Sequence, residues 1–182
     1  MQPRHKIDGK YNSNSRHCRR WKLTIDYLAI LGIKGKCLDC GDRTPLTDMI
    51  KRRFQVKVDN TNWDLDCSGG YSEDTFYENV FVFEVIEHLL NPLLFLRQLH
   101  PICKYVYLST PYKRPNWMRN KELHFHEFNM NELEYLIDVA GFKIIDKKII
   151  NATQWRYMFT GIRPFLRVLG FDRNVILRLR RK

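Results

Sequence analysis

The order of apolar segments predicts an α/β protein whose mainly parallel sheet carries helices on both faces. Short apolar runs alternate with segments in which apolar residues recur at helical spacing, as is typical of strand–helix repeats. The run VFVFEVI is almost continuously apolar, which is expected of a central strand buried on both faces. A length of 182 residues suits one domain with a sizeable core.

Helix and strand boundaries follow from periodicity and from glycine and proline. Gly32 and Gly141 are expected to end helices, and Pro45 stands in the first turn of another, where a proline is tolerated. The expected helices span residues 16–31, 44–54, 87–100 and 129–142. The expected strands span residues 35–40, 55–59, 77–86, 104–112, 143–150 and 174–181, with room for a short further strand within 60–70.

Basic residues concentrate at the two ends of the chain, and the formal net charge is +11. A basic surface attracts nucleic acid, anionic lipid or an anionic small substrate, or it serves solubility alone. We expect a flexible basic leader over residues 1–15 and a single domain over 16–182. Within that domain, residues 151–182 are expected to form a basic aromatic lid and a closing strand.

The five cysteines show no pattern of a disulfide framework or a metal site. Cys37 and Cys40 lie three apart in an expected strand, so they would point to opposite faces, and no second pair completes a zinc set. No apolar run approaches the ~20 residues that span a bilayer, and the N-terminus lacks the apolar core of a signal peptide. These features predict free thiols and a cytoplasmic protein.

Polar residues at strand ends are the candidates for ligand binding, because ligands of such sheets bind beyond the carboxyl ends of the strands. Asp59 ends the second expected strand about 20 residues after Gly41, where an acid can bond both hydroxyls of a ribose. It would otherwise form a turn. Asp64 or Asp66 would face an adenine amino group, or both belong to a solvated turn.

The turn after the first expected strand is unlike a pyrophosphate-binding loop. A dinucleotide fold would carry several glycines there, whereas Gly41 is followed by Arg43 and Pro45. Pro45 also lacks an N–H donor. A cofactor without phosphates is therefore favoured over a dinucleotide.

The segments FEVIEHLLNP and ELHFHEFN hold the densest chemistry in the chain. Glu84, Glu87 and His88 have i, i+3, i+4 spacing, which places them on one face if the chain is helical there. Two carboxylates and an imidazole suit a divalent metal or acid/base chemistry, and His124 and His126 would complete an octahedral-type site. Alternatively, Glu87 and His88 cap and orient a helix, and the later histidines order a loop.

In their order, these segments resemble the class I S-adenosylmethionine-dependent methyltransferases, and especially their broad small-molecule group (type 11 and type 23-like). The resemblance covers roughly residues 35–146. KCLDCGDR is similar to the first cofactor motif, VKVDN to the segment with the ribose-binding acid, and YENVFVFEVIEHLLNPLLFLRQL to the fourth strand and its helix. It implies a Rossmann-like three-layer sandwich with a seven-stranded sheet whose last strand is antiparallel.

The resemblance also implies S-adenosyl-L-methionine as cofactor. Asp39 and Gly41 would lie near its methionine end, Asp59 at its ribose and Asp66 near adenine, while Arg43 would pair with its carboxylate. The full set of implied cofactor residues is Asp39, Gly41, Arg43, Asp59, Asn60, Asp66, Phe83 and Glu84. Two departures from the family pattern are the missing glycines of the first motif and a short stretch between the second and third strands.

Two subgroups of this family use an E-x-x-E-H cluster as a metal site, namely ubiquinone-pathway O-methyltransferases and small-RNA 2′-O-methyltransferases. The similarity implies a divalent ion such as Mg²⁺ on Glu84, Glu87, His88 and His124, which would hold acceptor hydroxyls near the methyl group. Glu87, His88 and His126 are the implied catalytic residues, and a histidine would remove the hydroxyl proton.

These observations predict a methyltransferase that acts on a hydroxyl oxygen of an unidentified, anionic or small-molecule acceptor. Two alternatives stay open: a methyltransferase-like binding module without activity, and a metal-assisted RNA 2′-O-methyltransferase. The tail over residues 155–171 mixes aromatic residues with arginines and would form a lid or a patch for peripheral membrane contact.

Overall fold

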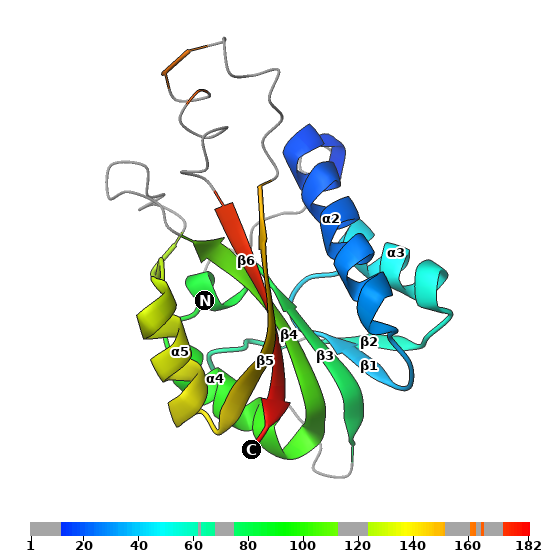
Figure 1. Ribbon diagram of the computed structural model, residues 1–182. Helices are drawn as coiled ribbons and strands as arrows, with labels where there is room; N and C mark the ends of the chain where they lie inside the picture. The colour runs from blue at the N-terminus through cyan, green and yellow to red at the C-terminus, as the bar shows by residue number, and fades with distance from the viewer. Residues whose placement is uncertain are drawn as a thin grey trace.

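The computed structural model shows one mixed sheet of six strands with helices on both faces, in the order β2-β1-β3-β4-β6-β5 (Figure 1). It describes residues 12–61, 63–67, 75–112, 124–151, 161–162, 165 and 173–182. This arrangement confirms the predicted Rossmann-like α/β class.

The strands from β1 to β4 run parallel, and β6 runs antiparallel to both of its neighbours. β6 therefore lies between β4 and β5 although it follows both in the sequence, which confirms the predicted antiparallel last strand. The strands are β1 (Cys37–Asp39), β2 (Val58–Asn60), β3 (Tyr77–Phe83), β4 (Cys103–Tyr112), β5 (Phe142–Ile150) and β6 (Arg173–Arg181).

Among the described residues, α2 (Ser15–Leu31) and α3 (Pro45–Phe54) pack on one face of the sheet, and α4 (Pro92–Leu99) and α5 (Met130–Val139) on the other (Figure 1). On one face, Leu28 and Ile50 from the first two helices pack in a buried cluster with Phe81 of β3. On the other face, Leu96 and Ile137 pack with the opposite side of the same strand.

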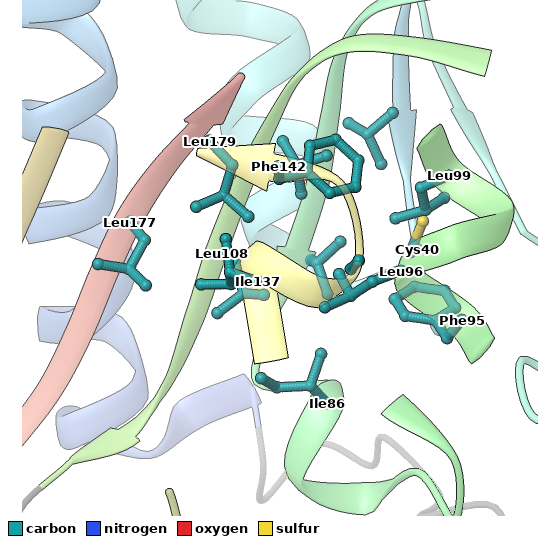
Figure 2. Packing of buried hydrophobic residues seen from close by; sticks show 14 of the residues in the cluster. Cys40, Ile86, Phe95, Leu96, Leu99, Leu108, Ile137, Phe142, Leu177 and Leu179 are labelled. Carbon is teal, nitrogen blue, oxygen red and sulfur yellow. The ribbon is translucent and has the colours of Figure 1, made fainter. Parts of the chain in front are cut away.

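The core on the α4–α5 face is built from alternate residues of neighbouring strands (Figure 2). Successive side chains of a strand point to opposite faces, so Val80 and Val82 belong to this cluster while Phe81 between them belongs to the other. Leu108 of β4 and Leu177 of β6 continue the same face and are fully buried. The central strands are thus apolar on both sides, as their sequences predict.

Cys37 and Cys40 lie in different layers of the molecule. Cys37 packs in the α2–α3 core and Cys40 in the α4–α5 core, and both are buried free thiols. Burial raises the pKa of the Cys37 thiol to about 11. This placement confirms the expectation that the two side chains point to opposite faces of the sheet.

Local sequence signals fix the ends of the helices. Asn14 caps α2 by accepting the N–H of Arg16, and Gly32 ends that helix in a left-handed conformation with φ 68°. At α5, Asn129 and Glu132 form a reciprocal capping box, in which each side chain accepts the other residue's backbone N–H.

Two details differ from the sequence-based expectations, and some predictions fall on residues that the structure does not describe. The sheet has six strands instead of seven, because the described residues 63–67 form turns and no strand. Glu84 is not helical, since its φ is 57° and the short 3-10 helix η1 begins only at Ile86 (Ile86–His88). The leader up to residue 11, residue 122 and most of the tail over 155–171 lie outside the described residues.

No helix among the described residues has both the length and the apolar character needed to cross a bilayer.

Candidate functional site

The candidate site lies where the parallel strands end. Asp39, Asn60 and Phe83 are the last residues of β1, β2 and β3, and Tyr112 ends β4. Because these strands are parallel and in register, their carboxyl ends meet at one edge of the sheet, where ligands of such folds bind.

Asp39 is a buried acid at the first turn. Its carboxylate accepts hydrogen bonds from the Thr47 hydroxyl of α3 and, at 3.4 Å, from the Asn60 side-chain amide. Burial raises the pKa of the Asp39 carboxyl to about 7, although these two hydrogen bonds and the nearby Lys51 act in the opposite direction. Asp39 thus joins β1, β2 and the start of α3 at a single point.

The backbone N–H groups of the first turn are used within the protein. Gly41 has φ 111°, a conformation that favours glycine, and its N–H donates to Thr61 Oγ1 at 2.8 Å. The Thr44 N–H donates to Thr47 Oγ1 at 3.2 Å, and Pro45 has no N–H. Two N–H groups of the turn are therefore engaged within the protein and a third position has none, which makes the turn a poorer pyrophosphate site than a glycine-rich loop.

Arg43, just before α3, forms an ion pair with Asp48 in the first turn of that helix. Its guanidinium lies 2.5 Å from an Asp48 oxygen, and both side chains are exposed. The hydrogen bond from Arg43 is the first cause of the lowered pKa of Asp48.

Asp59 and Phe83, two further predicted cofactor residues, lie on β2 and β3, the strands on either side of β1. The Asp59 side chain is 32% exposed, with Lys36 Nζ at 3.7 Å, Lys57 Nζ at 3.8 Å and the Tyr77 hydroxyl at 3.5 Å. Phe83 is half-buried at the end of β3. Asp59 therefore keeps a solvent-facing carboxylate for a ligand.

Asp66 has a structural role in the turn before α4. One of its oxygens accepts the backbone N–H groups of Leu90 at 2.7 Å and Asn91 at 3.0 Å. The adjacent Asp64 accepts the backbone N–H of Asp66 at 3.1 Å. Asp66 thus attaches the 63–67 segment to the η1–α4 region beside the strand ends.

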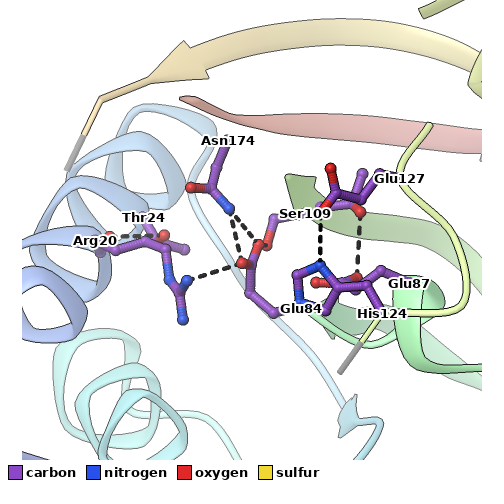
Figure 3. A network of polar contacts seen from close by, with 9 residues as sticks. Arg20, Thr24, Glu84, Glu87, Ser109, His124, Glu127 and Asn174 are labelled. Carbon is purple, nitrogen blue, oxygen red and sulfur yellow. Dashed lines mark hydrogen bonds and ion pairs between the residues drawn. The ribbon is translucent and has the colours of Figure 1, made fainter. Parts of the chain in front are cut away.

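Glu84 is the centre of a polar network that joins three elements (Figure 3). Its carboxylate accepts bonds from Arg20 of α2 at 2.8 Å, Ser109 of β4 at 2.8 Å, and the Asn174 amide of β6 at 2.7 and 2.8 Å. Glu84 is left-handed at φ 57°, which is costly for a residue with a side chain. The surrounding contacts therefore hold a strained residue next to η1.

Glu87 is a fully buried acid on the other side of that turn. The Thr110 hydroxyl donates to one carboxylate oxygen at 3.2 Å, while the other has no hydrogen-bond partner among the described residues. Burial and, secondly, the charge of Glu84 raise the pKa of Glu87 well above its ordinary range. The Glu87 carbonyl accepts the N–H groups of Phe125 and His126, at 2.9 and 3.1 Å, and so fixes the histidine loop beside η1.

Glu87, His88 and His124 offer ligand atoms that all lie within 4.8 Å of one another. The rings of His88 and His124 meet edge to face at 4.9 Å between centroids. His124 Nδ1 is 3.2 Å from a Glu127 carboxylate oxygen (Figure 3). Such a carboxylate–imidazole–imidazole group suits a divalent ion, and the unpartnered Glu87 oxygen fits one. The two imidazoles favour a transition-metal ion over Mg²⁺.

The structure thus brings together part of the predicted metal set and separates the rest. Glu84 belongs to the network with Arg20 and is not part of the three-residue group. His126 adjoins that group through its backbone, while its ring stacks on Phe128 at 5.3 Å. Its Nε2 is buried without a hydrogen-bond partner among the described residues.

Several site residues carried little or no sequence signal. Arg20 and Asn174 lie 64 and 90 residues from Glu84 in sequence, and only the fold brings the three together. Asn174 is buried, and it stands at the start of the apolar strand β6. A polar amide in front of an apolar run was the sequence feature that could have marked it as a site residue. Thr47 and Thr110 lie in segments that read simply as a helix and a strand.

No family model and no curated protein matches this sequence significantly. Solved structures do match. The methyltransferase candidate of Haloferax volcanii, in complex with its Trm112 activator, is 12% identical over 99% of both chains, with a TM-score of 0.75. A SAM-dependent methyltransferase from Archaeoglobus fulgidus is 13% identical over 94% of this chain and 97% of its own, with a TM-score of 0.66.

A third match shows what the likeness covers. The [4+2]-cyclase SpnF is 14% identical over 97% of this chain and 84% of its own, with a TM-score of 0.59. Proteins with different printed activities therefore share this architecture, and identities this low relate folds rather than reactions. The chain has the fold of the class I S-adenosylmethionine-dependent methyltransferases.

Proposed function

We propose that this protein transfers a methyl group from S-adenosylmethionine to a hydroxyl oxygen of its acceptor. One observation carries the proposal. The cofactor-type turn at Asp39 and Gly41 and the group of Glu87, His88 and His124 follow neighbouring parallel strands at one edge of the sheet. Methyl donor and acceptor must meet at such an edge for direct transfer.

On the cofactor side, the chain's own residues suit a nucleoside without phosphates. Asp59 would accept hydrogen bonds from the ribose hydroxyls, and Phe83 would line the pocket. A side chain at position 41 would meet Val85 at 3.4 Å, so Gly41 leaves room for a close approach to the backbone. The sulfonium of S-adenosylmethionine supplies an activated methyl group, so positioning of the acceptor can provide much of the catalysis.

The remaining cofactor assignments are more peripheral. Asp66 would lie at the adenine end, where its backbone bonds already hold the 63–67 segment in place. Asn60 supports Asp39. Arg43 would reach the cofactor carboxylate only by leaving Asp48, its partner in the structure.

On the acceptor side, we assign Glu87, His88 and His124 to a divalent ion. Such an ion would bind the acceptor hydroxyl and lower its pKa, which favours attack on the methyl group. His126, with a buried and unpartnered ring nitrogen, is the candidate to receive the hydroxyl proton. Glu84 would act through Arg20, Ser109 and Asn174 by holding the turn that presents Glu87.

Calorimetry tests the cofactor assignment. We expect saturable binding of S-adenosylmethionine or its demethylated product, and we expect Asp59→Ala to weaken it by roughly tenfold or more through loss of charged hydrogen bonds. Asp26→Ala, an exposed acid on α2, is the matched control. Absence of binding at millimolar cofactor would instead favour a binding module that keeps the fold without the reaction.

Titration with Mn²⁺ and Mg²⁺ tests the acceptor side. We expect Mn²⁺ to bind more tightly than Mg²⁺, and Glu87→Gln to abolish binding of both. Glu134→Gln, on the exposed face of α5, should leave binding unchanged. If Glu87→Gln binds the ions like the parent protein, the three-residue group is structural.

The acceptor class and the location of the protein also belong to this proposal. The net charge of +11 favours an anionic acceptor, either small or polymeric. Five free thiols accord with a reducing, cytoplasmic setting. The likeness to a chain solved with a Trm112 activator makes a small activator protein a further candidate partner.

A further inference from the structure

A group of basic residues and one tyrosine lies on the sheet face that also carries α2. We call it the basic strip: Tyr105 of β4, Lys143 and Lys148 of β5, and Arg178 and Arg180 of β6. Register partners in a sheet share a face, and Tyr105, Arg180 and Lys143 form one continuous row across three strands.

Two neighbouring rows place the strip on that face. Arg178 is in register with Tyr107, and Lys148 with Ile176. Tyr107 and Ile176 belong to the core beneath α2, so the side chains of the strip lie on the same side of the sheet as that helix.

Among the described residues, the lysines and arginines of the strip have no ion-pair partner within 4.0 Å, although six other ion pairs are formed there. The acid nearest in register, Asp146 beside Arg178, accepts the Tyr27 hydroxyl at 2.9 Å. Lys143, Lys148 and Arg180 are exposed to solvent.

The guanidinium of Arg178 lies against two aromatic rings. Its central carbon is over the Tyr105 ring at 4.3 Å from the ring centroid and over the Tyr107 ring at 5.8 Å. Lys104 Nζ also lies 5.3 Å from the Tyr105 ring. Planar guanidinium groups and aromatic rings bind nucleic-acid bases by stacking, and unpaired cations bind the phosphates.

We propose that the basic strip is a docking surface for single-stranded nucleic acid. A sheet face that offers cations on neighbouring strands and alternate residues repeats positive charge every ~5–7 Å in two directions. That pattern suits a flexible polyanion, which makes many weak phosphate contacts, better than a single small anion.

The strip begins at Lys148, in register with Ile176 near the candidate site, and its Lys143–Arg180 end lies far along β6 from that site. Asn174, which contacts Glu84, and Arg180 are six residues apart on one strand, or roughly 20 Å. A small metabolite cannot touch both places, whereas a polymer can dock on the strip while one residue reaches the strand ends. To this extent the inference rests on the proposed methyl transfer and names its substrate class.

Fluorescence anisotropy with a labelled single-stranded oligoribonucleotide of about 16 nucleotides tests the proposal, in the absence of cofactor and divalent ions. We expect binding that weakens steeply between about 50 and 200 mM salt. Lys143→Glu with Arg180→Glu should weaken binding roughly tenfold or more and lower the salt slope by at least ~1.4, or ~0.7 per lost phosphate contact.

A charge-matched control separates docking from net charge. Arg52→Glu with Arg97→Glu changes the net charge equally, on exposed positions of α3 and α4, and should bind like the parent protein. Arg178→Lys keeps the charge but loses the stacked plane, so its loss of affinity should persist at high salt. Circular dichroism checks that each variant is folded. If the double variant does not fold, Arg180→Glu alone, at an exposed position, replaces it in the binding assay.

Three results would overturn the inference. The first is an equal loss of oligonucleotide affinity in the strip double variant and in its charge-matched control. The second is no binding of the oligonucleotide, and the third is binding of phosphatidylserine-rich vesicles in its place. Because the assay contains neither cofactor nor ion, Glu87→Gln should bind RNA normally. Failure of docking is therefore distinguishable from failure of methyl transfer.

Discussion

Two acids three residues apart, Glu84 and Glu87, have separate surroundings although sequence spacing groups them. Glu84 is surrounded by donors from α2, β4 and β6, whereas Glu87 is buried with one oxygen that lacks a hydrogen-bond partner among the described residues. The difference arises because Glu84 is left-handed and η1 begins two residues later. A helical i, i+3 relation therefore does not apply to the pair.

Glutamine substitution at each position should separate a contribution to stability from a contribution to ion binding. Glu84→Gln removes the carboxylate charge that accepts hydrogen bonds from Arg20, Ser109 and Asn174, so we expect unfolding free energy to fall by about 1–3 kcal/mol while Mn²⁺ affinity changes little. Glu87→Gln should abolish Mn²⁺ binding with little loss of stability, since it removes a costly buried acid. Urea unfolding and calorimetry measure the two effects. Strong loss of Mn²⁺ binding in Glu84→Gln would make Glu84 a direct ligand.

Asp39 should make stability depend on pH. Its pKa is about 7 in the folded protein against 3.8 ordinarily, so between these values the native state keeps a proton that the unfolded chain has released. Stability therefore falls as pH rises through this window, by up to roughly 4 kcal/mol from this group. Relative to the parent protein, Asp39→Asn should gain stability from pH 4.5 to pH 8 in urea unfolding.

The matched control for that titration is Asp48→Asn. The pKa of Asp48 is lowered, so this exposed group stabilises the protein above its ordinary pKa and loses that effect only in acid. Its variant should show no gain between pH 4.5 and 8. A stability difference between Asp39→Asn and the parent that is constant with pH would contradict the assignment of a raised pKa.

At the scale of elements, the turn between α5 and β5 also contacts the segment that follows α4. α5 passes into β5 through Gly141, which has φ 90° and packs against His100 in η2 (His100–Ile102). This contact links the α4–η2 segment to the start of β5, on the face of the sheet opposite α2.

Alanine at two glycines should separate backbone strain from steric clash. In Gly141→Ala the added Cβ would lie 2.9 Å from the His100 ring, whereas in Gly32→Ala it would meet nothing within 4 Å. Both positions have positive φ, so Gly32→Ala should cost about 1 kcal/mol and Gly141→Ala measurably more. Thermal unfolding of both variants tests this order, and equal losses would show that the His100 ring moves aside freely.

For the whole molecule, the core between the sheet and α4–α5 should dominate stability. Leu177 is fully buried at the centre of β6, so Leu177→Ala should lower unfolding free energy by about 2–5 kcal/mol. Ile149 on the neighbouring β5 is 41% exposed, and Ile149→Ala should cost much less. Equal losses in urea unfolding would mean that Ile149 is covered by another part of the chain.

The sequence predicts the order and type of the main elements because strands such as 77–86 and 174–181 carry their own apolar patterns. It also predicts which strand ends hold Asp39, Asp59 and Glu87. It does not predict the left-handed Glu84 or its partners, since these depend on contacts between residues far apart in sequence. Over the described residues 63–67 the chain forms turns where the sequence left room for a short strand, and the turn-forming residues of that segment made the prediction ambiguous.

The insertion of β6 between β4 and β5 has a consequence for how the chain is made. During synthesis, β5 leaves the ribosome before β6, the strand that lies between β5 and β4 in the folded sheet. Until β6 is made, β4 and β5 each have an unpaired backbone edge. The closing step is a long-range, antiparallel pairing on two sides at once, which is slow compared with local folding. During that interval, β6 of a second copy can pair with β4 and β5 in place of the chain's own β6. We therefore expect domain swapping of β6 to be the main form of misfolding.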